Sequence, residues 1–326
     1  THRRTTPTAR GLFREFRTPI SPFSSLESRR LHPRQSSFMP GPQIENVSDT
    51  AFAVAHYRAA ETERADALFR DPLAGVLAGD HGKQMGAAFP VPWMVSQIVV
   101  IRTCIIDDFI RQAIAQGVDT ILNLGAGLDT RPYRMDLPES LLWIEVDYPR
   151  VIQFKDERLA AEKPRCKLER VPLDLANVSE RRKFLEAANA RAKKLLILTE
   201  GVVSYLSEED VASLADDLHA LDHASGWIVE YFSSALVRFR GRRRIRWNMQ
   251  NAPFKFTPKD WFAFFAAHGW RQKNIGYLVE EAERLGRPIK LPGVMGALMK
   301  LRSLFASPER RAAFRKFQAY VLLERS

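Results

Sequence analysis

The sequence predicts an α/β fold in which a seven-stranded, mostly parallel sheet carries helices on both faces. Three observations support this prediction. From about residue 90 onward, short apolar runs alternate with segments of helical periodicity, which is typical of a doubly wound sheet. The first of these runs, DTILNLG, leads into a glycine turn. Two further strand-like runs follow the fifth strand near the C-terminus.

The elements follow one another in a simple order. A long apolar helix that ends at Gly117 precedes the first strand. Later in the chain, Ser207 is expected to cap a helix whose first turn is Glu208-Glu209-Asp210, because carboxylates stabilise the positive end of a helix dipole. We expect strands within 119–125, 141–148, 167–175, 195–201, 226–232, 270–278 and 317–326, and helices over 95–116, about 149–162, 178–190, from 208 onward and over 260–268.

Residues 46–89 also have a helical pattern, and they come before the sheet begins. Ligands bind at the carboxyl ends of the strands in open α/β sheets, so helices at this point in the chain could cover that edge. We therefore divide the chain into a leader (1–45) and one domain (46–326). Within the domain we expect a helical cap with an entry helix over 46–116 and a sheet core over 117–326, interrupted by an insertion at about 237–258.

The net charge of +11 is concentrated at the N-terminus. Residues 1–38 hold eight arginines against two glutamates, a balance of +6, so the rest of the chain is near +5. This leader lacks apolar periodicity and is expected to be disordered. It is either an organelle-type presequence or an upstream segment that is not translated; we favour the second, because the first methionine is Met39. The expected location is the cytoplasm, or an organelle if the leader is a presequence.

A second basic segment, RFRGRRRIRW, places six arginines within residues 238–246. A solvated surface segment is the ordinary explanation, and binding to an acidic substrate, a membrane surface or nucleic acid is the alternative. The sequence contains no RNA-stacking motif and no zinc finger that would favour nucleic acid.

Cysteine usage and hydropathy exclude several classes of protein. The two cysteines, Cys104 and Cys166, are too few for a disulfide framework or a four-ligand zinc site, and we expect no metal centre. The most apolar stretch, VPWMVSQIVVIRTCII, contains Arg102 and is too short to span a bilayer.

The turn after the first strand, NLGAGLDTRPYR, indicates a nucleotide-type pocket. Gly125 and Gly127 allow the backbone to pass close to a ligand at the mouth of the sheet. A dinucleotide-binding turn has a third glycine beside its pyrophosphate, and this chain has Thr130 there. S-adenosylmethionine has no phosphate, so this turn suits it better.

Carboxylates follow the next two strands. Asp147 ends the second strand, 20 residues after Gly127, where it could accept hydrogen bonds from both ribose hydroxyls. Asp174 follows the third strand and could accept from an adenine amino group, with Leu175 against the ring. Each acid could also be an ordinary strand-end or turn residue.

Two more charged residues are expected near the pocket. Glu200 ends the fourth strand and could bind the cofactor ammonium or a substrate, or form a structural ion pair. Arg102 interrupts an apolar helix, where a guanidinium needs a carboxylate partner. That partner could be the cofactor carboxylate or an internal acid such as Asp129.

These stretches together resemble the leucine carboxyl methyltransferase family, in particular its bacterial branch of S-adenosylmethionine-dependent O-methyltransferases associated with polyketide-type metabolism. The resemblance is spread in order over about residues 46–232. It rests on RADALFRDPLA (64–74), RTCIIDDFI (102–110), NLGAGLDTRPYR (123–134), IEVDYPRVIQFK (144–155), VPLDL (171–175) and TEGVVSYL (199–206).

The resemblance implies a Rossmann-like class I methyltransferase sheet with an N-terminal helical cap. It also implies cofactor binding by the residues at the matched positions, which are Arg102, Gly125, Asp147, Asp174, Leu175 and Glu200, and a DTRPYR turn whose Asp129 and Arg131 shape the pocket. Eukaryotic members methylate the C-terminal carboxylate of a protein phosphatase subunit, but the residues that recognise that tail have no counterpart here. The substrate therefore does not carry over.

We conclude that the sequence predicts an S-adenosylmethionine-dependent O-methyltransferase acting on a carboxyl or hydroxyl group, with a small molecule as the expected acceptor and a protein C-terminal carboxylate as another. The catalytic residue is not identified; the candidates are Glu200 and Tyr205, with His56, Tyr57 and Arg58 in the cap. The alternatives are an NAD-type oxidoreductase and a basic nucleic-acid-binding protein built on a vestigial enzyme fold.

Overall fold

The computed structural model describes residues 47–89, 91–233, 254–289 and 307–326. Three predictions from the sequence therefore lie wholly or largely outside the described residues. They concern the basic leader (1–45), the arginine cluster (238–246) and most of the insertion placed at about 237–258.

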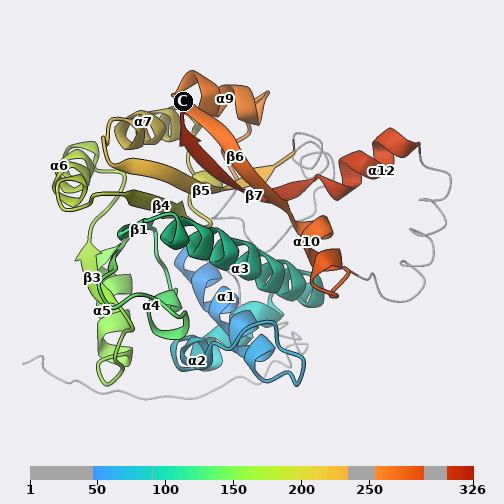
Figure 1. Ribbon diagram of the computed structural model, residues 1–326. Helices are drawn as coiled ribbons and strands as arrows, with labels where there is room; N and C mark the ends of the chain where they lie inside the picture. The colour runs from blue at the N-terminus through green and yellow to red at the C-terminus, as the bar shows by residue number, and fades with distance from the viewer. Residues whose placement is uncertain (1–46, 90, 234–253, 290–306) are drawn as a thin grey trace, which may run out of the picture. The chain divides into compact units, whose positions relative to one another are not determined.

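The described part of the chain folds around one seven-stranded sheet, as predicted (Figure 1). Its strand order is β3-β2-β1-β4-β5-β7-β6, in which β1 to β5 are parallel and β7 is antiparallel to both of its neighbours. The strands are β1 (Thr120–Leu124), β2 (Leu142–Asp147), β3 (Lys167–Pro172), β4 (Leu195–Thr199), β5 (Ala224–Phe232), β6 (Trp270–Tyr277) and β7 (Gln318–Arg325).

Helices cover both faces of this sheet. Side chains of α6, α7 and α9 form one hydrophobic core with it, and side chains of α3 and α10 form another on the opposite face. The helices are α1 (Val47–Thr62), α2 (Pro72–Ala87), α3 (Pro92–Ala115), α4 (Arg131–Arg134), α5 (Pro149–Arg158), α6 (Val178–Asn189), η1 (Val203–Tyr205), α7 (Glu208–His219), α9 (Trp261–Ala267), α10 (Leu278–Arg284) and α12 (Pro308–Arg315).

Most of the predicted boundaries are close to the observed ones. Ser207 caps α7 with a reciprocal capping box that includes Asp210, as its sequence indicates. Gly117 follows α3 with φ 90°, a left-handed conformation that favours glycine. The helix predicted to reach residue 162 ends instead at Arg158. The third strand ends at Pro172 rather than 175, because Pro172 pairs with Asp147, the last residue of β2.

Three helices and one short turn were not predicted. The helix α4 and the turn η1 have four and three residues, which is too short for a periodicity to be visible. The helices α10 and α12 have seven and eight residues, and each lies directly beside a strand in the sequence. Short helices such as these depend on tertiary packing more than on their own sequence.

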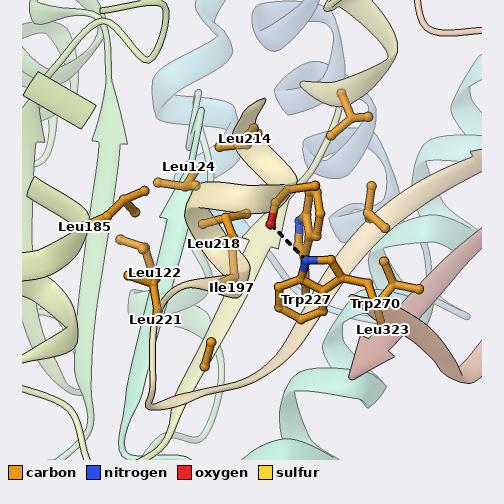
Figure 2. Close-up of a cluster of buried hydrophobic side chains, with 14 of the residues drawn as sticks. Leu122, Leu124, Leu185, Ile197, Leu214, Leu218, Leu221, Trp227, Trp270 and Leu323 are labelled. Atoms are coloured by element: carbon orange, nitrogen blue, oxygen red, sulfur yellow. Dashed lines mark hydrogen bonds between the residues drawn. The ribbon is translucent and has the colours of Figure 1, made fainter. Parts of the chain in front are cut away.

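Two tryptophans fill the centre of the core beneath α7 and α9. Trp227 of β5 and Trp270 of β6 are fully buried, and their ring centroids lie 5.5 Å apart. Leucines of α6, α7 and the central strands surround them (Figure 2). Both indole N–H groups are satisfied, since Trp227 donates to Thr199 Oγ1 at 2.9 Å and Trp270 donates to the Ala215 carbonyl at 3.0 Å. This core holds β5, β6 and α7 together.

The strand order also determines where a ligand can bind. From β1 the chain winds outward through β2 and β3, and from β4 it winds in the opposite direction through β5. The crossovers therefore leave the sheet in opposite directions at the β1–β4 boundary, and ligands bind at such a switch point outside the carboxyl ends of the strands.

The Trp227→Ala substitution should lower the free energy of unfolding by about 3–5 kcal/mol, because it leaves a cavity in a core that cannot collapse to fill it. Urea unfolding followed by circular dichroism measures the change. The matched control is Val76→Ala on α2, where the side chain is 47% exposed and the expected change is within about 0.5 kcal/mol. Equal losses in the two variants would contradict the assignment of the core.

Candidate functional site

The predicted binding residues meet at one edge of the sheet. Gly125 follows β1, Asp147 ends β2, Asp174 follows β3 and Glu200 follows β4. These four strands are parallel, so their carboxyl ends lie along the same edge, on both sides of the β1–β4 switch point. This is the place where a ligand is expected in a doubly wound sheet.

The glycine turn needs its glycines. Gly125 has φ 69°, and a Cβ at this position would lie 2.4 Å from Cγ2 of Val202 in the loop after β4. Gly127 has φ 48°, and its Cβ would lie 3.4 Å from Cβ of Ala51 on α1. The turn is therefore in close contact with the β4 loop on one side and with the cap helix on the other. Larger residues would push both of them away.

Asp147 holds this turn from the neighbouring strand. Its Oδ2 accepts a hydrogen bond from the Gly127 N–H at 2.7 Å, and its Oδ1 accepts one from the Tyr148 N–H at 2.7 Å. Burial raises the pKa of Asp147, although both of these backbone hydrogen bonds oppose the shift. Each carboxylate oxygen has two lone pairs, so both can accept a further hydrogen bond from a ligand hydroxyl.

Asp174 and Leu175 occupy the next position along the edge. The Asp174 side chain is exposed and accepts a hydrogen bond from the Ala176 N–H at 2.9 Å, which closes a short turn after β3. Leu175 is half-buried and packs against the core, and its carbonyl accepts from Arg181 Nη1 at 2.8 Å. The local turn thus fixes both residues at the mouth of the sheet, and their contact with adenine stays a prediction.

Arg131, in the DTRPYR turn, has three carboxylate partners. Its Nε donates to Asp107 Oδ1 at 2.7 Å, and its Nη1 donates to Asp129 Oδ2 and to Glu200 Oε2, each at 2.8 Å. The side chain of Arg131 is 2% exposed. A buried guanidinium is stable only with such partners, and its planar fork allows it to bind several of them at once.

The contacts continue from Arg131 into the cap. Asp107 on α3 also accepts from Arg134 Nη1 at 2.7 Å, and Arg134 lies 3.5 Å from Asp71. Asp71 precedes α2, accepts from the Thr130 hydroxyl at 2.6 Å, and pairs with Arg58 of α1 at 2.8 Å. We call the eight charged residues of this set the buried charge network: Arg58, Asp71, Arg102, Asp107, Asp129, Arg131, Arg134 and Glu200.

Arg102 completes the network at the sheet edge. Its Nε lies 3.0 Å from Glu200 Oε1, and both side chains are partly accessible, at 16% and 13%. The sequence suggested Asp129 as an internal partner of Arg102, and this prediction is wrong. Asp129 pairs with Arg131 and accepts a hydrogen bond from Asn123 Nδ2 at 2.9 Å. The ion pair proposed for Glu200 is present. Whether Glu200 and Arg102 also bind a ligand stays a prediction.

The network keeps its acids ionised. Burial alone would raise the pKa of Asp129, but Arg131 and Arg58 hold it far below its usual range. The pKa values of Asp107 and Glu200 are lowered in the same way, again against burial, by Arg134 and Arg131 and by Arg131 and Arg102 respectively. With four arginines and four carboxylates, the network is neutral overall.

Of the catalytic candidates, Tyr205 lies at this edge and those of the cap pack against α2. Tyr205 belongs to η1 and interacts electrostatically with Arg102. Tyr57 donates to the Gly86 carbonyl at 2.7 Å, and the His56 ring lies so close to Gly86 that a Cβ there would meet it at 2.8 Å. Arg58 donates to the Leu128 carbonyl and pairs with Asp71. The contacts of these three cap residues are therefore structural.

The structural roles of Asp71, Asp107 and Arg134 were not predicted from the sequence. Asp107 lies in the matched stretch RTCIIDDFI and was given no role of its own, yet its side chain is 1% exposed and pairs with two arginines. A carboxylate five residues after an arginine in the same apolar helix was the signal, because a buried charge requires a partner. Its partners are distant in sequence and could not be named.

Neither a metal-ligating cluster nor a membrane-spanning helix was found in the described ranges. No group of three or more histidine, cysteine, aspartate or glutamate side chains there is placed to hold a metal ion. None of the helices in the described ranges is long and apolar enough to cross a membrane.

The Arg131→Gln substitution should lower the free energy of unfolding by about 3–5 kcal/mol, because Asp107, Asp129 and Glu200 would keep their buried charge and lose their shared partner. Urea unfolding measures this loss. Arg191→Gln is the matched control, since Arg191 is 48% exposed and pairs with Glu169 on the surface, where a salt bridge contributes at most about 1 kcal/mol. A loss no larger than that of the control would show that the network is dispensable.

The Asp129→Asn variant should reveal the lowered pKa of Asp129. A carboxylate whose pKa falls on folding stabilises the folded state above its unfolded pKa of about 3.9, and this contribution is lost as the pH falls towards the folded pKa. The variant should therefore be less stable than the wild type by a constant amount from pH 7 to about pH 4, and the gap should narrow below that pH. Urea midpoints at a series of pH values test this, and a gap that widens on acidification would contradict it.

Comparison with known proteins identifies relatives of this chain. Residues 51–219 match the family profile described as leucine carboxyl methyltransferase. A protein of Streptomyces avermitilis, named as an S-adenosyl-L-methionine-dependent methyltransferase, is 33% identical over 261 residues, covering 77% of this chain and 92% of its own. A protein of the same description from Mycobacteroides abscessus is 31% identical over 280 residues, covering 75% and 90%.

A solved structure gives a further comparison. The crystal structure of a DUF574 family protein from Streptomyces avermitilis is similar, with a TM-score of 0.49 and 15% identity, covering 83% of this chain and 97% of its own. The family profile spans more than half of the present chain, and both relatives are more than 30% identical to it over at least 90% of their own length. The chain therefore belongs to the leucine carboxyl methyltransferase family and is a methyltransferase that uses S-adenosylmethionine.

Proposed function

We propose that the protein transfers the methyl group of S-adenosylmethionine to a carboxyl or hydroxyl oxygen of a small molecule. The family description names a carboxyl group as the acceptor, which supports transfer to oxygen. One structural observation carries the proposal further. The partly accessible Arg102–Glu200 pair lies at the same strand edge as Asp147. Groups suited to the amino-acid end of the cofactor and to its ribose therefore lie at one edge of the sheet.

The residues at this edge fit the cofactor. Gly125 has φ 69° and packs against Val202, so the glycine turn after β1 is held compactly at the mouth of the sheet. Asp147 has lone pairs left for the two ribose hydroxyls, and Asp174 with Leu175 follows β3 on the adenine side. When bound, S-adenosylmethionine supplies an electrophilic methyl group on a sulfonium.

Arg102 and Glu200 complement the amino-acid end of the cofactor. That end is a zwitterion, with a carboxylate for Arg102 and an ammonium for Glu200, so the two residues can exchange their mutual ion pair for two ligand ion pairs. Glu200 retains Arg131 at 2.8 Å during this exchange, which holds its carboxylate in place and ionised. Binding then costs little rearrangement of the protein.

The main task of the remaining site is alignment. Methyl transfer is an in-line displacement, so orientation of the acceptor against the methyl group supplies much of the rate. A carboxylate acceptor, with a pKa of about 4, is already ionised at neutral pH, whereas a phenol, with a pKa of about 10, needs a base or a polarising group. Family membership displaces the NAD-type alternative, while the nucleic-acid alternative rests on an arginine cluster outside the described residues.

We also propose a reducing, cytoplasmic setting and a small-molecule acceptor. Cys104 and Cys166 are both free, as is usual in reducing compartments. A protein C-terminal carboxylate is the other acceptor considered. A transfer assay with radiolabelled S-adenosylmethionine over small carboxylic acids, phenols and a peptide with a free C-terminus tests the acceptor. Transfer only to the peptide would overturn the small-molecule proposal.

The Asp147→Asn variant should bind S-adenosylhomocysteine about 10- to 100-fold more weakly, because an amide has one acceptor oxygen where the carboxylate offers two to the ribose hydroxyls. Isothermal titration calorimetry measures the Kd. Asp156→Asn is the matched control, since Asp156 is 55% exposed and pairs with Arg170 away from this edge. An unchanged Kd in Asp147→Asn would reject the ribose role, and the absence of binding by the wild type would reject the proposed function.

A further inference from the structure

A buried carboxyl group on β5 has no role in the cofactor site described above. Glu230 is 3% exposed and lies near the carboxyl end of this strand. Its Oε1 accepts a hydrogen bond from the Ser204 N–H at 2.9 Å. Its Oε2 is also buried and makes no hydrogen bond of good geometry among the described residues, although the Ser204 side chain and the Gly201 backbone are close enough to the carboxyl group to oppose the rise of its pKa. A buried oxygen of this kind destabilises the fold unless a further group, such as a ligand hydroxyl, donates a hydrogen bond to it.

The sheet order places Glu230 on the acceptor side of the cofactor residues. The predicted cofactor contacts follow β3, β2, β1 and β4 in spatial order, from adenine to the amino-acid end, and β5 is the next strand. Thr199 pairs with Val229, so Glu200 and Glu230 come next on their two strands. The group beside the amino-acid end is thus in the position from which an acceptor can reach the methyl group.

The side chain of Glu230 is on the same face of the sheet as α3. Glu230 pairs with Tyr320 across β5 and β7, so their side chains share a face. Tyr320 belongs to the core under α3, together with Ile228, two residues before Glu230. Tyr320 also interacts electrostatically with Arg102, Glu200 and Glu230. These groups therefore surround one small region at the end of the sheet.

The charges in this region favour a neutral acceptor. Within the described residues, no arginine or lysine forms a salt bridge with Glu230, and the arginines of the buried charge network already face equal numbers of carboxylates. An acceptor carboxylate beside Glu230 would meet a like charge, and the cation of this region, Arg102, is already paired with Glu200. A hydroxyl group can instead donate its proton to Oε2.

We propose that Glu230 is the general base for the transfer and that the acceptor is a hydroxyl group of phenol type. This inference rests on the proposed function. The acceptor O–H proton passes to Glu230 Oε2, the acceptor oxygen forms the new O–CH3 bond, and the S–CH3 bond breaks with its electron pair remaining on sulfur. Burial raises the pKa of Glu230, which brings the carboxylate closer to the strength that a base for a phenol requires.

The Glu230→Gln variant separates this role from a structural one. Glutamine keeps an oxygen for the Ser204 N–H but cannot take up a proton. With phenol as acceptor and radiolabelled S-adenosylmethionine, kcat should fall roughly 100-fold or more, while KM and the Kd for S-adenosylhomocysteine stay within about twofold. With 4-nitrophenol, which is already ionised at pH 8, kcat of Glu230→Gln should fall much less, because this acceptor needs no base. Glu186→Gln, an exposed change on α6, is the matched control.

Two further readouts complete the test. Infrared difference spectra of the S-adenosylhomocysteine complex should show a carboxyl band that titrates, shifts on addition of phenol and is missing from Glu230→Gln. In the wild type, kcat should rise with pH as the Glu230 carboxyl group loses its proton. The other ionisable groups nearby are Arg102, Glu200 and Tyr320. In the variant this rise should disappear.

Several outcomes would overturn the inference. They are equal rates of phenol methylation in the variant and the wild type, methylation of benzoate in preference to every phenol tested, or no transfer to any phenol by a wild type that binds the cofactor. If the wild type fails to bind S-adenosylmethionine at all, the proposed function fails as well, so the two failures are distinguishable.

Discussion

The arrangement of the site depends on Arg131, a buried guanidinium that binds carboxylates from three separate parts of the chain. It joins Asp107 of α3, Asp129 of its own turn and Glu200 after β4. Through Asp107, Arg134 and Asp71, the same network reaches the cap helices. A charge this deeply buried is stable only when all its partners are in place. The buried charge network therefore joins α1, α2 and α3 to the edge of the sheet, in addition to the hydrophobic contacts between these helices.

The buried charge network also fixes residues at the edge of the sheet where the cofactor is proposed to bind. Glu200 pairs with Arg131 as well as with Arg102, so in the proposed function its carboxylate would keep one partner when Arg102 turns to the ligand. On the other side of the switch point, Asp147 fixes the glycine turn through the Gly127 N–H. Two preorganised carboxylates then stand at the carboxyl ends of β2 and β4, with β1 between them. In the proposed function, the entropy cost of ordering these side chains would be met during folding and not during binding.

The sequence predicted the fold well because its signals are local. Alternating apolar runs, Ser207 before an acidic turn and glycines after helices each report on their own neighbourhood, and all agree with one sheet. The candidate residues Gly125, Asp147, Asp174 and Glu200 were predicted for the same reason, since each follows a recognisable strand. Short elements such as α4 and α10 were not predicted, because too few residues carry their pattern.

By itself the sequence determined the order of strands and helices, the carboxylates at the strand ends and, through GAGLDTRPYR with EVDYP, the family. Only the tertiary structure decided which charges meet. Two partners of Arg131 lie 24 residues before it and 69 residues after it, and no local pattern relates such positions. The unsatisfied oxygen of Glu230 is likewise visible only when β5, β7 and η1 are brought together. Whether a charged residue is buried, and which residue it pairs with, depends on how the chain packs. These pairs could therefore be identified only from the three-dimensional contacts.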